Sequence, residues 1–191
     1  MLKVTEAGFT YGKGPLLFSG ISFEVKEGET LAILGPNGIG KTTLLRCIMR
    51  FLELSEGQIE IGGRDVRQLK SGEFWKDISY VPQAKRLVFG YSAVNMVVMG
   101  LSQNVAFGRT PKKSDYEKAY QLLDGFGLND IADQSCNTLS GGQLQMVLIA
   151  RSLIKRPRLL IMDEPESNLD MKNQLIVLNT IERLAGDRLA I

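Results

Sequence analysis

The feature that most constrains the fold is a glycine-rich loop between a short apolar run and a helical pattern. The apolar run covers residues 30–34 and is typical of a strand buried on both faces, as in a parallel sheet. From Thr42 onward, apolar residues recur at helical spacing. The loop, residues 35–42, fits the pattern G-x-x-x-x-G-K-S/T. This order of strand, loop and helix predicts an α/β fold that binds the phosphates of a nucleotide.

The residue types in this loop suit a phosphate group. Glycines let consecutive backbone N–H groups approach an anion, since a side chain would block that approach. The helix that follows directs its positive end toward the same anion. We expect Lys41 to reach the β- and γ-phosphates and the Thr42 hydroxyl to bind Mg²⁺. The predicted site consists of Gly35, Pro36, Asn37, Gly38, Gly40, Lys41, Thr42 and Thr43.

Two acidic residues, Asp163 and Glu164, follow a second apolar run at residues 158–162. A parallel sheet would bring the end of this strand beside the phosphate loop. Asp163 would then hold Mg²⁺ through water, and Glu164 would polarise the attacking water as a general base. The alternative is that the pair forms only the polar end of a strand. The presence of the phosphate loop favours the catalytic interpretation.

The composition excludes several other classes of protein. The chain has 191 residues, which suits one domain or one domain with a small subdomain. It has no histidine, which excludes histidine metal sites and Ser-His triads. The net charge of +2 is too small to indicate nucleic-acid binding. The two cysteines, Cys47 and Cys136, predict buried or half-buried thiols and no disulfide framework.

The rest of the chain divides into regions of different pattern. Short strands are expected in the first thirty residues, at 58–61 and at 78–81. The middle is expected to be mostly helical, with Ser114 and Glu117 forming a capping box. Two further helices are predicted from apolar spacing, one by Leu144, Val147, Leu148, Arg151 and Ile154, and one by Leu175, Leu178, Ile181 and Ala185.

No apolar run approaches the roughly 18 residues that a spanning helix needs. The N-terminus also lacks the apolar core and the cleavage site of a signal peptide. We therefore expect a cytosolic protein, which a partner could hold at a membrane.

Residues 139–143, Leu-Ser-Gly-Gly-Gln, complete a set of motifs that resembles the ATP-binding cassette (ABC) ATPases. Ser140 is expected to cap a helix whose first N–H groups Gly141 and Gly142 leave open to a phosphate. Taken alone, these residues could also be an ordinary helix start. The resemblance implies a P-loop NTPase fold with a mainly parallel central sheet, an N-terminal antiparallel β subdomain and a helical insert.

The resemblance covers the whole chain as a single ABC ATPase domain, residues 1–191. It implies a β subdomain and phosphate-loop core at 1–83, a helical insert at 84–134, and the signature helix, the carboxylate strand and the D-loop at 135–191. The family places a histidine beyond the last of these segments, and the chain ends at Ile191 before reaching it. We therefore expect that this sequence is cut short and that this form hydrolyses ATP poorly.

The resemblance also implies an activity, ligands and partners. It implies hydrolysis of ATP with Mg²⁺ by a head-to-tail homodimer with two shared ATP sites. Residues Ser140, Gly141, Gly142 and Gln143 would face the γ-phosphate held by the other subunit, and residues 167–170 would cross the interface. Tyr11 would stack on adenine, although it could instead be a core residue at a strand edge. Gln83 would touch Mg²⁺ and the attacking water.

Residues 97–100 and 147–153 are similar to the ATPases of iron–siderophore, haem and cobalamin importers. This similarity implies an ATPase that couples dimer closure to uptake, peripheral to the cytoplasmic face of the cell membrane. Its partners would be transmembrane permease subunits and, indirectly, a substrate-binding protein, with no nucleic acid. Three alternatives stay open: a metal-ion importer ATPase, a non-transport cassette in cofactor assembly, and a nucleotide-binding regulator without turnover.

Overall fold

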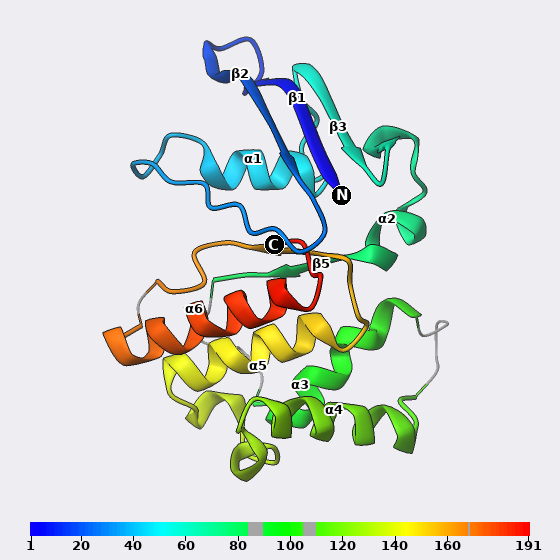
Figure 1. The fold of residues 1–191 in the computed structure, drawn as a ribbon, viewed down its shortest axis with the longest axis vertical. Coiled ribbons are helices and arrows are strands. Elements are labelled where there is room, and N and C mark those ends of the chain that lie inside the picture. Colours follow the sequence, from blue (N-terminus) through cyan, green and yellow to red (C-terminus); the bar gives the residue numbers. More distant parts are fainter. Residues whose placement is uncertain (84–89, 105–109, 168) are drawn as a thin grey trace.

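The computed structural model describes residues 1–83, 90–104, 110–167 and 169–191. The strands are β1 (Leu2–Thr10), β2 (Leu16–Val25), β3 (Glu56–Ile61), β4 (Arg64–Asp65), β5 (Ile78–Val81) and β6 (Leu159–Met162). The α-helices are α1 (Lys41–Ile48), α2 (Ser71–Asp77), α3 (Ala93–Val98), α4 (Lys113–Gly125), α5 (Gly141–Leu153) and α6 (Met171–Gly186). Short 3-10 turns are η1 (Val66–Gln68), η2 (Met99–Asn104), η3 (Asn129–Ile131) and η4 (Cys136–Thr138). Figure 1 shows a body of strands with α1 above a layer of helices.

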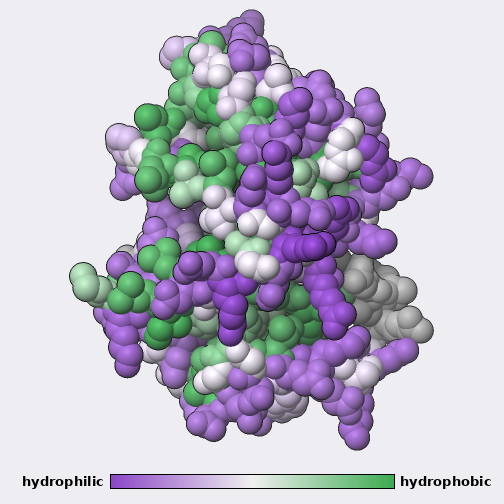
Figure 2. Space-filling view, in the orientation of Figure 1, coloured by the Kyte–Doolittle hydropathy of each residue, from purple (hydrophilic) through white to green (hydrophobic). Residues whose placement is uncertain are grey.

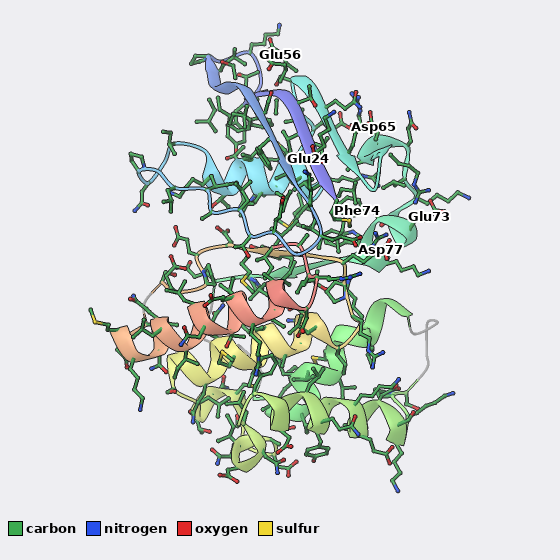
Figure 3. All side chains as sticks on the ribbon, in the orientation of Figure 1. Glu24, Glu56, Asp65, Glu73, Phe74 and Asp77 are labelled. Atoms are coloured by element: carbon green, nitrogen blue, oxygen red, sulfur yellow. The ribbon has the colours of Figure 1, made fainter. Side chains whose placement is uncertain are left out.

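The upper body is an antiparallel sheet in the order β2-β1-β3-β4. Leu2 of β1 pairs with Val25 of β2 on one side and with Ile61 of β3 on the other. Apolar side chains of β1 and β3 pack against α1 and α2 in one buried cluster. Figure 3 shows Phe74, which is part of this cluster, where α2 leads into β5. The strands predicted for the first thirty residues and for 58–61 are thereby confirmed.

The parallel part of the fold is formed by β5 and β6, which pair from Ile78–Leu159 to Val81–Met162. Both strands are largely buried because helices and the upper body cover their faces. A parallel bridge also joins Leu159 to Ala190. The predicted strands at 78–81 and 158–162 are confirmed, and their carboxyl ends lie side by side.

The predicted strand at residues 30–34 is wrong. In the described part of the chain, its backbone pairs only at the start: Leu31 N–H donates to the Ile191 carbonyl at 2.9 Å, and Ile191 N–H donates to the Glu29 carbonyl at 3.0 Å. Beyond that point a cavity of about 530 Å³ separates the segment from β6 and α6. Leu34 is consequently 89% exposed. Among the described residues, no backbone hydrogen bond joins residues 32–34 to a neighbouring strand.

The lower body is built around α5, which contacts α3, α4, α6 and β5. Every residue of α5 from Leu144 to Ala150 is buried, so this helix is covered on nearly all sides. The predicted apolar stripe therefore accounts for only part of the buried surface of α5. Both cysteines are buried, as expected.

The predicted helix is confirmed as α6, but only part of its predicted apolar stripe is buried: Ile181 packs against the core cluster around α5. Val177 and Thr180 are buried, whereas Leu175 and Leu178 are about half exposed. The buried face packs on α5, and Leu178 lines the cavity beside residues 30–34. Figure 2 shows apolar patches among polar side chains near the start of this helix.

The predicted capping box of Ser114 and Glu117 is also wrong. Helix α4 begins at Lys113, and the carboxylate of Asp115 accepts a hydrogen bond from the N–H of Lys112 at 2.9 Å. Ser114 therefore lies inside the first turn, where it cannot be the cap. No helix among the described residues is long and apolar enough to cross a bilayer.

Candidate nucleotide site

The phosphate loop leads directly into α1, which begins at Lys41. Gly38 and Gly40 have φ angles of 83° and 109°, a region that residues with side chains rarely adopt. A Cβ on Gly40 would also lie 3.1 Å from the side chain of Leu17. These two glycines are therefore required by the backbone itself. Loop and helix follow one another as predicted.

The ammonium group of Lys41 lies against the loop. It donates hydrogen bonds to the carbonyls of Gly35 and Pro36, at 2.8 and 3.0 Å. Charged ammonium groups bind phosphate oxygens more strongly than neutral carbonyls. A phosphate bound by the loop would therefore displace the two carbonyls as partner of the ammonium group. Lys41 already lies at the loop, so its side chain would not need to move far.

Tyr11 lies beside the start of α1. Its hydroxyl is 3.2 Å from the hydroxyl of Thr43, and its ring packs edge-on against Phe9 at 4.8 Å. Tyr11 is still 57% exposed, so much of its ring faces solvent next to the phosphate loop. Thr43 is buried, and its hydroxyl is engaged by Tyr11.

Thr42 and Asp163 meet at the edge of the parallel strands. The Thr42 hydroxyl donates to Oδ1 of Asp163 at 3.3 Å, and the Tyr80 hydroxyl donates to Oδ2 at 3.4 Å. Burial and the neighbouring Asp163 carboxylate raise the pKa of Tyr80, so Tyr80 stays a donor. Pairing of β5 with β6 places Asp163 here, since Asp163 N–H donates to the Val81 carbonyl. A hydroxyl and a carboxylate beside a phosphate loop are hard oxygen ligands, which fit Mg²⁺.

Gln83 and Glu164 form a second pair at the same strand ends. The Gln83 amide donates to the Ser167 hydroxyl at 2.7 Å and to a carboxylate oxygen of Glu164 at 3.3 Å. The Ser167 hydroxyl in turn donates to the Glu164 carbonyl at 3.0 Å. Glu164 is exposed and has a φ of 48°. Such conformations cost free energy outside glycine and concentrate at functional sites.

The signature residues start α5 as a capping box. The Ser140 hydroxyl accepts from the Gln143 N–H at 3.3 Å, and the Gln143 side chain accepts from the Ser140 N–H at 2.9 Å. The predicted cap at Ser140 is confirmed. None of the hydrogen bonds described for these two residues reaches the phosphate loop. Figure 1 shows the starts of α1, α5 and α6 on the same side of the molecule.

Sequence reasoning missed two members of the site. Tyr80 was expected only as a strand residue, and Ser167 only as part of the 167–170 segment, in which Asn168 lies outside the described residues. Ser167 contacts Gln83 from 84 positions away, and Tyr80 contacts Asp163 from 83 positions away. No local pattern in the sequence signals such contacts, because they depend on the pairing of β5 with β6.

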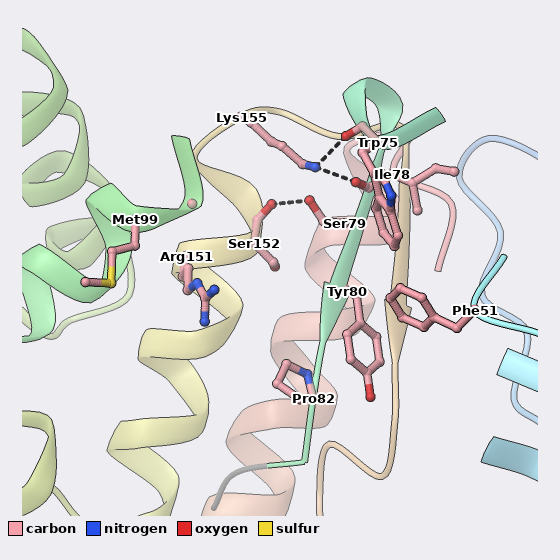
Figure 4. Close-up of a pocket in the computed structure, with 11 residues that line it drawn as sticks. Phe51, Trp75, Ile78, Ser79, Tyr80, Pro82, Met99, Arg151, Ser152 and Lys155 are labelled. Atoms are coloured by element: carbon pink, nitrogen blue, oxygen red, sulfur yellow. Dashed lines mark hydrogen bonds between the residues drawn. The ribbon is translucent and has the colours of Figure 1, made fainter. Parts of the chain in front are cut away.

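A second hollow, of about 410 Å³, lies where α2 and β5 meet the end of α5 (Figure 4). Its walls include the aromatic rings of Phe51, Trp75 and Tyr80. Lys155 closes one end, donating to the carbonyls of Trp75 and Ile78. Burial lowers the pKa of Lys155 to about 8. Tyr80 thus lines this hollow, which we call the Tyr80 groove, and its hydroxyl also donates to Asp163.

Comparison with known proteins identifies a family. Residues 18–167 match the ABC transporter family. The "Probable iron chelatin transport ATP-binding protein" of Helicobacter pylori is 39% identical over 95% of this chain and 71% of its own length. The molybdate import ATP-binding protein MolC of Haemophilus influenzae is 37% identical over 96% of this chain and 68% of its own length.

Solved structures agree with this result. A metal-chelate type ABC transporter in an inward-facing conformation superposes with a TM-score of 0.85 at 36% identity, covering 98% of this chain and 69% of that one. A dimeric cassette in a post-hydrolysis state with ADP and Pi superposes with a TM-score of 0.79 at 26% identity, covering 99% and 85%. The chain therefore belongs to the ABC transporter family, as an ATPase cassette that uses ATP with Mg²⁺.

Proposed function

We propose that this chain is the ATP-hydrolysing subunit of an importer, and that its cargo is a metal chelate. The observation that carries the ATPase role is the meeting of Thr42 with Asp163 and of Gln83 with Glu164 at one edge of the fold. This edge gathers a metal-binding pair and an acid–amide pair beside a phosphate loop. Phosphoryl transfer to water needs these groups together.

Each residue of the site has a role in this proposal. Backbone groups of residues 35–40 and the ammonium of Lys41 bind the β- and γ-phosphates, and the exposed ring of Tyr11 stacks on adenine. Thr42 and Asp163 hold Mg²⁺, which neutralises charge on the phosphates when bound. Glu164 accepts a proton from the attacking water, and Gln83 orients Glu164 and that water.

The second half of each ATP site comes from another copy of the chain in this proposal. Ser140, Gly141, Gly142 and Gln143 stand at the start of α5, where backbone N–H groups and the helix dipole favour an anion. The γ-phosphate held by the partner copy is the proposed anion. The dimeric relative with ADP and Pi supports this arrangement.

The cargo is inferred from relatives. The iron chelatin protein and the metal-chelate transporter are 39% and 36% identical to this chain. Molybdate and phosphonate import proteins follow at 35–38% identity, so oxyanions are the second candidate cargo. A permease would hold the chain at the cytoplasmic face of the membrane, and a substrate-binding protein would deliver the chelate. The Tyr80 groove is a candidate permease contact.

Glu164→Gln tests the hydrolytic role. The substitution keeps the size and removes the base, so turnover should fall by about 10²–10⁴-fold while MgATP binding persists. ATP-bound dimers should then accumulate, as light scattering can detect. Glu166→Gln is the matched control, because Glu166 is an exposed acid in the same loop. Unchanged hydrolysis in Glu164→Gln contradicts the assigned role.

Co-purification tests the transport role. The tagged chain is isolated from detergent-solubilised membranes of its native cells, and the bound proteins are identified by mass spectrometry. A permease with many membrane-spanning helices supports the proposal, and metal-chelate binding by a co-purifying binding protein supports the cargo. Recovery with a soluble assembly scaffold, ribosomes or DNA overturns the transport role and leaves the ATPase in place.

A further inference from the structure

The first turn of α5 is packed directly on the first turn of α6. A Cβ on Gly142 would lie 2.2 Å from Oδ1 of Asn173 and 2.3 Å from its Cγ. Gly142 is buried, so the Asn173 side chain occupies the space that any larger residue would need. Next to it, a Cβ on Gly141 would lie 3.3 Å from the side chain of Leu169. The lack of side chains at these two glycines therefore makes room for Asn173 and Leu169.

The side chain of Asn173 is held in place by Asp170, the cap of α6. Oδ1 of Asp170 accepts from the Asn173 N–H at 2.8 Å, and Oδ2 accepts from the Asn173 side-chain amide at 3.0 Å. With both carboxylate oxygens engaged, the amide has little rotamer freedom left. The contact with Gly142 is thus made by an ordered group.

The same short stretch of chain also reaches the site of hydrolysis. Gln83 donates to Ser167, whose hydroxyl donates to the carbonyl of Glu164. Asp170 and Asn173 follow three and six positions after Ser167. The contact with Gly142 is therefore made within the same short stretch of sequence that holds Glu164 and Ser167. Side-chain packing of this kind carries coupling between sites.

We propose that Asn173 is a positioning residue for the ATP-driven pairing of two copies. It sets where Ser140 and the first N–H groups of α5 stand relative to Glu164, and so whether one copy's α5 can meet the ATP held by the other. This inference rests on the proposed function. Asn173 acts through Gly142 and touches neither ATP nor water itself.

Asn173→Ala in the Glu164→Gln background tests this role. Removing the amide leaves the backbone cap from Asp170 in place, so the fold should persist. The ATP concentration for half-maximal dimer formation should rise about tenfold. The affinity of the dilute monomer for MgATP should stay within about twofold, since the phosphate loop is untouched. Asn179→Ala is the matched control, because Asn179 is an exposed asparagine of the same helix.

A double-mutant cycle identifies the contact. Gly142→Ala should weaken dimerisation much less in the Asn173→Ala background than in the parent, because the added methyl then meets fewer atoms. Additive effects, dimerisation of Asn173→Ala at the parent's ATP concentration, or loss of ATP binding by its monomer would each overturn the positioning role. If the Glu164→Gln parent binds ATP and never dimerises, the proposed shared site fails, and this inference fails with it.

Discussion

The hydroxyl of Thr42 donates a hydrogen bond to Asp163 across 3.3 Å, although 121 positions separate the two residues in sequence. Thr42 comes from the first helix, and Asp163 follows the last described strand. Tyr80 donates to the other carboxylate oxygen. The carboxylate is thus oriented toward the phosphate loop by protein groups alone, which lowers the cost of organising a metal site.

Asp163→Asn should abolish most of the Mg²⁺ dependence of turnover. The amide keeps the size and removes the charge that a divalent cation requires. We expect kcat to fall by about 10²–10³-fold, while ATP binding measured without Mg²⁺ is unchanged. Asp187→Asn, at an exposed acid after α6, serves as the control. A Mg²⁺ titration of activity that matches the parent would refute the metal role.

Gln83→Ala should lower kcat more than it changes ATP affinity. The substitution removes the hydrogen bonds to Glu164 and Ser167, which leaves the proposed base less well oriented. A misplaced base typically costs about tenfold or more in rate. Single-turnover hydrolysis and equilibrium ATP binding separate the two effects. Gln121→Ala, at an exposed position of α4, should match the parent, and equal losses in both variants would contradict the orienting role.

Lys155 should make stability rise with pH in the alkaline range. Burial holds its pKa at about 8, below the ordinary 10.5, so the unfolded chain binds more protons between these values. Raising the pH from about 8 to 10.5 therefore favours the folded state at this residue. Since Lys155 is only half buried, we expect the free energy of unfolding to rise by about 1–2 kcal/mol over this range. Urea unfolding of the parent and of Lys155→Met over this pH range measures the difference between their free energies of unfolding. A difference that does not change with pH contradicts the prediction.

Gly100→Ala should destabilise the contact between η2 and α5. The new Cβ would lie 2.0 Å from the Arg151 carbonyl oxygen and 2.7 Å from the Ile154 side chain. We expect a loss of about 1–3 kcal/mol in the free energy of unfolding. Gly72→Ala is the matched variant, because its Cβ meets nothing within 4 Å and Gly72 lies in α2. A helical alanine there should add about 0.5–1 kcal/mol. Equal losses in the two variants would exclude a steric cause.

Local patterns predicted most of the elements, but they failed for the strand at residues 30–34 and for the cap of α4. The strands β5 and β6 and the cap at Ser140 follow from residues adjacent in sequence, and the structure confirms them. The buried face of α6 followed only in part, because Leu175 and Leu178 satisfy helical spacing but stay about half exposed, whereas Ile181 packs on the core. Which apolar stripe is buried depends on the neighbour that covers it.

The sequence by itself determined the form of the phosphate loop. Gly38, Gly40 and Lys41 lie within four positions of one another, so the backbone conformation of the loop and the contact of Lys41 with it are set locally. Only the tertiary structure decided which groups meet across the fold. Parallel pairing of β5 with β6 brings Gln83 to Glu164 and Tyr80 to Asp163, and helix packing brings Asn173 to Gly142. The physical reason is the separation along the sequence. Backbone conformation is set by residues a few positions apart, whereas the position of a strand end depends on a partner strand about eighty residues away.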